Sequence, residues 1–290
     1  MDEKILKDKI GSLSIWTRGD QRAPHKPLLL LYALARYQQG RTRYLPYIEV
    51  KDKLKKLLIE FGPQRRSYHP EQPFVRLTKD GIWSLNKEVE RDNIKNNYLI
   101  QNELVGGFND EVCQLLNKDP NLTEEVADII LNEHFPQSIH EDILLAVGLE
   151  IGVKKKKIRD PMFRNKILKA YEYSCAVCGF NVRLGNNLVA IEAAHIKWFQ
   201  MGGPDSEENG IALCSLHHKL FDRGVFTLTN ERNLIVAEEA HGTQGFNEWL
   251  MRYHGKPIRK PINPIYQPKE TFLNWHVREV FKGPARYHIQ

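Results

Sequence analysis

Apolar side chains recur every three to four positions along much of the first half of the chain, the spacing that lines one face of an α-helix. Over residues 48–61 the repeat is clear, and Gly62 and Pro63 end it. The same pattern predicts helices over residues 2–11, 28–37, 123–133, 140–149 and 160–173. Thr123 is the expected N-cap of the third of these, because its hydroxyl can accept a hydrogen bond from the first turn.

Two short apolar runs predict strands in the same half of the chain. Residues 74–77 (FVRL) and 82–85 (IWSL) flank Lys79, Asp80 and Gly81, which is turn chemistry. We therefore expect a β-hairpin after the helices.

The second half has a different order of elements. Apolar residues on both sides of His195 place this histidine on or just after a strand, and the glycine-rich stretch 202–205 reads as a loop. His217 and His218 are expected to open a helix after a second strand. The fold class is thus α+β, with an N-terminal helical domain bearing a hairpin and a C-terminal ββα domain.

Length and composition support two globular domains. The chain has 290 residues, 41% hydrophobic and 27% charged, which suffices for a core in each half. Lys154 to Lys157 and Arg159 form a basic run, read either as a solvated linker or as a strap that follows a phosphate backbone. We place the boundary there, with domains at residues 1–152 and 153–290.

Charge and cysteine usage narrow the class of protein. The net charge of +6 fits a polyanionic partner such as double-stranded DNA. The N-terminus has no secretory signal and no segment reads as membrane-spanning, and the four cysteines do not form a secreted disulfide pattern. We expect a cytoplasmic protein in which Cys113, far from the other three, is a core residue.

The remaining cysteines form two knuckles. Cys175 and Cys178 have the C-x2-C spacing, and Cys214 and His217 repeat it as C-x2-H. Two such turns supply four ligands in a tetrahedron, which suits structural Zn²⁺. His217 and His218 could exchange roles, and His217 is preferred for zinc because its C-x2-H spacing equals the C-x2-C spacing upstream.

The residues between and after the knuckles resemble the HNH endonuclease family, through His195, Asn209 and His218. The resemblance implies that His195 is the general base, that Asn209 orients this histidine or its loop, and that His218 helps to hold a catalytic Mg²⁺ or Mn²⁺ ion. Glu192 is a candidate carboxylate for this ion or for His195, and a surface glutamate is an equal alternative. Asp222 shares a helix face with His218 as a supporting or structural residue.

Nearly the whole chain also resembles phosphorothioate-dependent (type IV, McrA-like) restriction endonucleases, which pair a sulfur-binding domain with an HNH domain. The resemblance rests on residues 22–31 (RAPHKPLLLL), 69–77 (HPEQPFVRL), 159–163 (RDPMF) and 281–286 (FKGPAR). It implies that Pro73 and Phe74 belong to a sulfur pocket, since apolar edges favour the larger, less hydrated sulfur over oxygen.

Other residues of these stretches are expected to contact DNA. Arg22, His25 and Lys26 would meet phosphates or base edges. Tyr68 adds apolar surface. Gln72 stands where relatives carry tyrosine, and Arg76 where some carry a small residue. An amide at position 72 can hydrogen-bond a base edge, which keeps open a reader of a methylated base or of an unmodified sequence.

A zinc-containing DNA-binding protein without catalysis is the alternative from another class, and the histidine–asparagine–histidine set of residues 195, 209 and 218 argues against it. Because one ββα site cuts one strand at a time, a homodimer is expected for double-strand cleavage.

Overall fold

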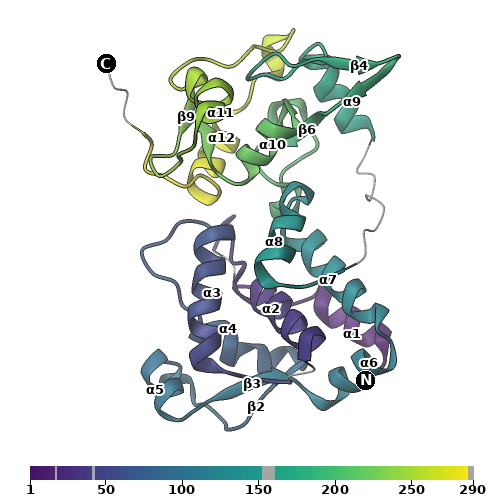
Figure 1. The fold of residues 1–290 in the computed structure, drawn as a ribbon, viewed down its shortest axis with the longest axis vertical. Coiled ribbons are helices and arrows are strands. Elements are labelled where there is room, and N and C mark those ends of the chain that lie inside the picture. The colour runs from purple at the N-terminus through teal and green to yellow at the C-terminus, as the bar shows by residue number, and fades with distance from the viewer. Residues whose placement is uncertain (17, 41–42, 152–160, 287–290) are drawn as a thin grey trace. The chain divides into compact units, whose positions relative to one another are not determined.

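The computed structural model describes residues 1–16, 18–40, 43–151 and 161–286 of the chain, and Figure 1 labels its helices and strands. The chain forms two compact units, Met1–Lys154 and Lys155–Gln290. The expected basic run 154–159 lies outside the described residues. No helix in the described ranges is long and apolar enough to cross a lipid bilayer.

The first unit is mostly helical, with one small sheet. Its helices are α1 (Glu3–Gly11), α2 (His25–Gly40), α3 (Tyr47–Phe61), α4 (Glu71–Arg76), α5 (Asn96–Gln101), α6 (Asp110–Lys118), α7 (Asn121–His134) and α8 (His140–Val147). Its strands are β1 (Tyr44–Pro46), β2 (Trp83–Leu85) and β3 (Val105–Phe108), which pair antiparallel in the order β1-β3-β2.

Helix α2 is the centre of this unit. Leu28 to Leu31 are fully buried on consecutive positions, as expected for a helix enclosed on all sides. Helices α3, α4, α7 and α8 all contact it. The predicted helices over 2–11, 28–37, 48–61 and 140–149 are confirmed as α1, α2, α3 and α8, with small changes at their ends.

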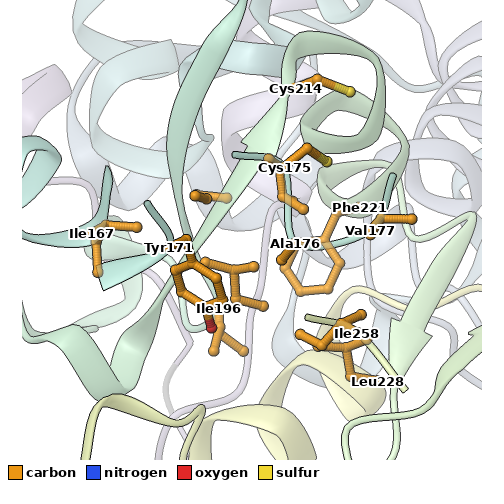
Figure 2. Packing of buried hydrophobic residues seen from close by; sticks show 14 of the residues in the cluster. Ile167, Tyr171, Cys175, Ala176, Val177, Ile196, Cys214, Phe221, Leu228 and Ile258 are labelled. Atoms are coloured by element: carbon orange, nitrogen blue, oxygen red, sulfur yellow. The ribbon is translucent and has the colours of Figure 1, made fainter. Parts of the chain in front are cut away.

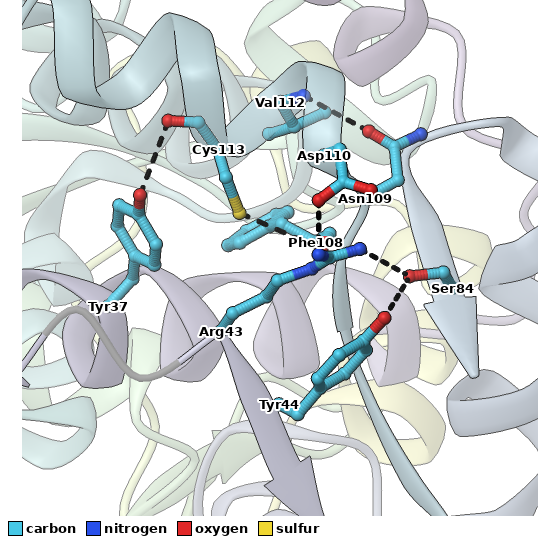
Figure 3. Close-up of polar contacts among 9 residues, drawn as sticks. All are labelled: Tyr37, Arg43, Tyr44, Ser84, Phe108, Asn109, Asp110, Val112 and Cys113. Atoms are coloured by element: carbon cyan, nitrogen blue, oxygen red, sulfur yellow. Dashed lines mark hydrogen bonds and ion pairs between the residues drawn. The ribbon is translucent and has the colours of Figure 1, made fainter. Parts of the chain in front are cut away.

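A polar network joins the sheet to helix α6 (Figure 3). Arg43 donates from Nε to the Phe108 carbonyl at 2.9 Å and pairs with Asp110. Tyr37 Oη donates to the carbonyl of Cys113 at 3.2 Å. Cys113 is buried, which confirms it as a core residue.

Two predictions for this unit are wrong in detail. Residues 74–77 do not form a strand: Phe74 to Arg76 belong to helix α4, and a 3-10 turn from Leu77 to Asp80 follows. The hairpin is therefore absent from this stretch, and β2 pairs instead with the distant β3. Pro70 precedes the first turn of α4, where a fixed φ favours helix. Likewise Thr123 is not an N-cap, because α7 already begins at Asn121.

The second unit contains the ββα arrangement. Its helices are α9 (Pro161–Ala170), α10 (Ser215–Asp222), α11 (Gln244–Trp249) and α12 (Glu270–Glu279). Its strands form three antiparallel pairs: β4 (Val182–Leu184) with β5 (Asn187–Val189), β6 (Ile191–His195) with β7 (Gly210–Cys214), and β8 (Phe226–Leu228) with β9 (Leu234–Val236). The expected order of strand, loop, strand and helix is confirmed by β6, β7 and α10.

An apolar core holds these elements together (Figure 2). It joins Ile167 and Tyr171 near α9 to Ile196 after β6, Phe221 of α10 and Leu228 of β8. The C-terminal helix α12 packs here as well, since Trp275 and His276 are buried and the His276 ring stacks on Phe221 at 3.7 Å. The tail is thus part of this unit.

Candidate functional site

Four soft ligands converge beside the ββα core. The ligand atoms of Cys175, Cys178, Cys214 and His217 all lie within 4.8 Å of one another. Individual separations are 3.1 Å from Cys214 Sγ to His217 Nδ1 and 4.0 Å from Cys178 Sγ to Cys214 Sγ. A tetrahedral Zn²⁺ with bonds of about 2.0–2.3 Å has ligand–ligand edges of roughly 3.5–3.8 Å, so the donor set and its spacing fit zinc.

The histidine of this cluster is held by a second contact. His217 Nε2 lies 2.7 Å from the backbone carbonyl of Trp249, and the residue is fully buried. A proton on Nε2 leaves the lone pair of Nδ1 directed at the three sulfurs, which is the usual support of a metal-bound histidine. The contact with Trp249 therefore fixes the His217 ring in the orientation that a metal ligand needs.

His195 lies at the end of β6 and is 5% exposed. Its ring stacks on Phe163 of α9, with centroids 3.9 Å apart and planes 14° from parallel. Its Nε2 lies 2.7 Å from Asp205 Oδ1, so the glycine-rich loop supplies a carboxylate partner. The ring is fixed on one face and at one nitrogen.

Asn209 braces the loop between β6 and β7. Its Oδ1 accepts from the Lys197 N–H at 2.8 Å, and its Nδ2 donates to the carbonyls of Lys197 and Pro204, both at 3.0 Å. A Cβ on Gly203 would lie 1.9 Å from the Lys197 carbonyl oxygen, so only glycine permits this close approach. Asn209 thereby ties the two ends of the segment that carries Asp205.

His218 lies on α10 between two carboxylates. Glu192 Oε2 is 2.6 Å from its Nδ1, and Asp222 Oδ2 is 3.1 Å from its Nε2. Burial lowers the pKa of His218, but Asp222 and Glu192 outweigh it and raise the pKa to about 9. Asp222 is itself held, since its Oδ1 accepts from Trp198 Nε1 at 3.0 Å.

Within the described ranges, the Cys3His set is the one group of three or more residues whose ligand atoms all lie within 4.8 Å of one another. A second ion near His218 would thus have few protein ligands. That is the usual situation of Mg²⁺, which keeps several waters and takes one or two carboxylates together with phosphate oxygens. Glu192 supplies such a carboxylate, whereas His218 has a carboxylate at each ring nitrogen and would have to lose a proton and one of these contacts to bind an ion.

The first unit contains a large basic cavity of about 1,080 Å³. Among the described residues that line it, none is acidic and seven are arginine or lysine: Arg18, Arg22, Lys26, Arg65, Arg66, Arg76 and Lys79. His25, Tyr68, Gln72 and Pro73 also line it, so seven of the eight residues expected to meet DNA are brought together. Such a charge pattern suits a nucleic-acid backbone.

The eighth residue, Phe74, is a correction. Its side chain is fully buried beneath α4, with its ring 4.9 Å from that of Tyr47 and 5.9 Å from that of Trp83. It cannot touch DNA in this fold. The resemblance had placed Phe74 in the sulfur pocket, with a core ring as the alternative, and helix α4 turns the ring into the core and leaves Pro73 at the cavity.

Two of the residues expected to contact DNA are bonded to groups within the first unit. Arg22 Nη2 donates to the Phe61 carbonyl at 2.7 Å, and Lys26 Nζ forms an ion pair with Asp80 at 2.5 Å. Both side chains are at least nine-tenths buried. Both cationic side chains line the cavity, and the Phe61 carbonyl and Asp80 fix their positions.

A chain of polar contacts runs along one wall of the cavity. Ser67 Oγ lies 2.9 Å from His69 Nε2, and His69 Nδ1 lies 3.0 Å from Glu71 Oε1. Burial lowers the pKa of neighbouring His25 to about 4, and His69 adds to this effect. His25 is therefore neutral near pH 7.

Sequence reasoning missed Asp205, Ser67 and His69 as site residues. Asp205 stood in a glycine-rich loop without a spacing rule that would link it to His195. Ser67 precedes the 69–77 stretch and His69 begins it, and only the turn into α4 directs both to the cavity.

Two protein-family models match the chain. A family model described as an HNH endonuclease matches residues 175–229, which contain His195, Asn209, His218 and the four clustered ligands. The second unit is therefore an HNH endonuclease domain, and the protein is a nuclease. A second family model, described as ScoMcrA-like, DNA sulfur-binding domain, matches residues 3–151, just over half of the chain. The chain belongs to this ScoMcrA-like family of DNA sulfur-binding proteins.

Solved structures to which the chain is similar are matched at TM-scores below 0.5. The sulfur binding domain of SprMcrA complexed with phosphorothioated DNA is 20% identical, with a TM-score of 0.45, covering 51% of this chain and 95% of that one. The corresponding ScoMcrA domain is 19% identical, with a TM-score of 0.43, over 49% and 94% of the two chains. The type IV phosphorothioation-dependent restriction endonuclease ScoMcrA is 18% identical, with a TM-score of 0.40, over 57% and 38%. No curated protein matches the chain significantly.

Proposed function

We propose that this protein is a restriction endonuclease that binds phosphorothioated DNA in the cavity of its first unit and hydrolyses a nearby phosphodiester bond in its HNH domain. The reading domain is assigned to residues 1–152 and the nuclease domain to residues 153–290. The observation that carries the proposal is the composition of the cavity wall. Pro73 lies there among seven cationic side chains, and none of the described lining residues is acidic.

Sulfur recognition follows from the chemistry of this cavity. A non-bridging sulfur is larger and less hydrated than oxygen, so contact with the apolar edges of Pro73 and Tyr68 costs it less desolvation. The surrounding arginine and lysine side chains balance the negative charge of the same phosphate. The neutral His25 adds a polar contact without further charge.

Hydrolysis is assigned to His195. Asp205 accepts from the Nε2 proton, so the basic lone pair is on Nδ1, and the stack on Phe163 keeps the ring from turning. This imidazole then takes a proton from the attacking water. Asn209 maintains the loop that holds Asp205 in place. Glu192, together with His218 once this ring has released a proton, would hold a divalent Mg²⁺ or Mn²⁺ ion, which supplies Lewis-acid stabilisation of the charge on the cleaved phosphate.

Structural Zn²⁺ is assigned to Cys175, Cys178, Cys214 and His217. The knuckle of Cys175 and Cys178 precedes the β4–β5 pair, and the other joins β7 to α10. One ion therefore staples the two ends of the sequence that contains His195. Its role is to supply folding free energy rather than chemistry.

A matched pair of duplexes tests the function. One carries a single stereodefined phosphorothioate and the other is all-oxygen, each incubated with Mn²⁺ or Mg²⁺. We expect cleavage of the sulfur duplex only. Equal cleavage of both supports a reader of a methylated base or of an unmodified sequence, and binding without cleavage supports a zinc-containing DNA-binding protein.

Double-strand cleavage is assigned to a homodimer, because each chain holds one His195 site. Sedimentation of the protein on the cleavable duplex measures this. We expect two chains for each duplex, and cutting whose rate falls steeply on dilution. A monomer that cuts both strands of one duplex in a single encounter contradicts the dimer.

A further inference from the structure

Helix α4 forms a rigid part of the cavity wall. Phe74 anchors it in the core, and buried Glu71 holds it to His69. The residues on its cavity side are Gln72, Pro73 and Arg76, all of which line the pocket. Side chains four residues apart on such a helix lie next to one another.

Gln72 and Arg76 use this spacing. Gln72 Oε1 accepts a hydrogen bond from Arg76 Nε at 2.9 Å. The other end of the glutamine amide, Nε2, lies 3.5 Å from the Ile94 carbonyl oxygen, a long contact that still favours one orientation of the amide. Gln72 therefore occupies the Nε–H of the guanidinium and fixes its plane.

The opposite edge of the guanidinium remains available. Arg76 is exposed, and within the described ranges neither Nη atom has a hydrogen-bond or ion-pair partner. Arg22 and Lys26 differ, since each is buried and bonded to a protein acceptor. Arg76 thus combines a fixed plane with two parallel N–H donors that face outward.

We propose that Arg76 is a specificity-determining residue that donates both Nη groups to the O6 and N7 atoms of a guanine beside the bound phosphate, and that Gln72 is the positioning residue that aims it. Two coplanar acceptors on a base edge require a donor pair held at one angle, which the bond to Gln72 supplies. A phosphate presents acceptor oxygens in several directions, so a cation whose plane is not held, such as the exposed Arg66 of the same cavity, can also meet it.

The inference rests on the proposed function, because it requires DNA in this cavity. It adds a base preference to the sulfur preference. The chain would read a two-part mark, a modified phosphate and a neighbouring guanine, rather than the phosphate alone.

The test measures equilibrium binding of the full chain to phosphorothioate duplexes in which each nearby guanine is replaced in turn by 7-deazaguanine, which lacks the N7 acceptor. We expect one position to weaken binding by about 5- to 150-fold, the range of a bidentate base contact. In Arg76→Met that position should have no effect. In Gln72→Met the effect should shrink, and Gln72→Met should add nothing further in the Arg76→Met background.

Two matched variants distinguish the orientation of the Arg76 guanidinium from its positive charge. Arg76→Lys keeps the cation without the planar donor pair, so we expect it to keep the salt dependence of binding and to lose the guanine preference. Arg66→Met, from the same cavity, should weaken binding to all duplexes alike and lower the salt slope by about one. Thermal unfolding of each variant checks that the fold is intact.

The opposite results are equally definite. A uniform loss with a reduced salt slope in Arg76→Met makes this residue a phosphate contact and overturns the proposal. Additive effects of Gln72→Met and Arg76→Met overturn the positioning role. Equal binding of sulfur and oxygen duplexes contradicts the sulfur proposal alone, because the guanine scan can be run on either duplex.

Discussion

The Oδ1 atom of Asp205 lies 2.7 Å from Nε2 of His195, so a loop residue ten positions along the chain orients the histidine at the end of β6. Asp205→Ala should lower the single-turnover cleavage rate by about 10- to 100-fold, the usual effect of losing a partner that orients an active-site histidine. Asp205→Asn keeps an acceptor oxygen without the charge, so its cleavage rate should lie between those of the wild type and Asp205→Ala. Glu207→Ala, in the same loop, is the control, and a wild-type rate in Asp205→Ala would contradict the role.

His195→Ala should abolish cleavage and keep binding. Loss of a general base costs about 10²- to 10⁴-fold in rate. The measurement is cleavage of the phosphorothioate duplex beside binding of the same duplex, with zinc content determined in parallel. Loss of binding with zinc unchanged would show that His195 holds DNA rather than activating water.

Cys178→Ser should release the zinc ion and unfold the second unit, because such a site supplies folding free energy. The measurements are metal content and thermal unfolding. Cys113→Ser is the matched control, since Cys113 is a buried thiol of the other unit and should leave the metal content unchanged. A Cys178→Ser protein that remains fully folded without zinc would refute a structural metal.

The first unit should lose stability in mild acid through His134. Burial lowers the pKa of His134 from 6.5 to about 4, so the folded state keeps it neutral while the unfolded chain takes up a proton below about pH 6.5. This contribution to stability is present above pH 6.5 and is lost as the pH falls toward 4. His25, whose pKa is also lowered to about 4, acts in the same direction.

Urea unfolding at several pH values checks this. His134→Leu should reduce the acid-dependent loss by up to about one proton per molecule. His241→Leu is the control, because His241 is exposed. An unchanged pH dependence in His134→Leu would exclude His134 as the source.

Gly210 should tolerate no side chain. It pairs with His195 across β6 and β7, and a Cβ there would lie 2.1 Å from Ile167 Cδ1 on α9. Gly210→Ala should destabilise the second unit by about 1–3 kcal/mol, as for overpacking of a core. Gly11→Ala, where a Cβ meets nothing within 4 Å, should leave the free energy of unfolding almost unchanged.

The close Cys3His cluster and the ββα order could be predicted because each follows from local spacing. Cys175 and Cys178 form one turn, Cys214 and His217 another, and the strand before His195 has its own apolar pattern. These features need no knowledge of distant contacts. The Asp205–His195 pair could not be found this way, because the loop path that joins them is set by Asn209.

The error at residues 74–77 has a different cause. The run FVRL has three apolar side chains and one arginine, which fits a strand as well as one helical turn, and a segment of this length does not distinguish the two. Tertiary packing decides the matter: Phe74 fills the space between Tyr47 and Trp83 only when α4 turns it inward. Because this segment is a helix, Phe74 is a core residue and not part of the cavity wall.

The buried C-terminal helix limits how far the nuclease can be trimmed. His276 of α12 stacks on Phe221, and Phe163 of α9 stacks on His195, yet both aromatic contacts come from outside the 175–229 stretch that the HNH family model matches. A fragment cut to that stretch would expose the faces of both rings to water. Domain transplantation should therefore carry residues 161–286 as one piece, and tags are better attached beyond Arg286.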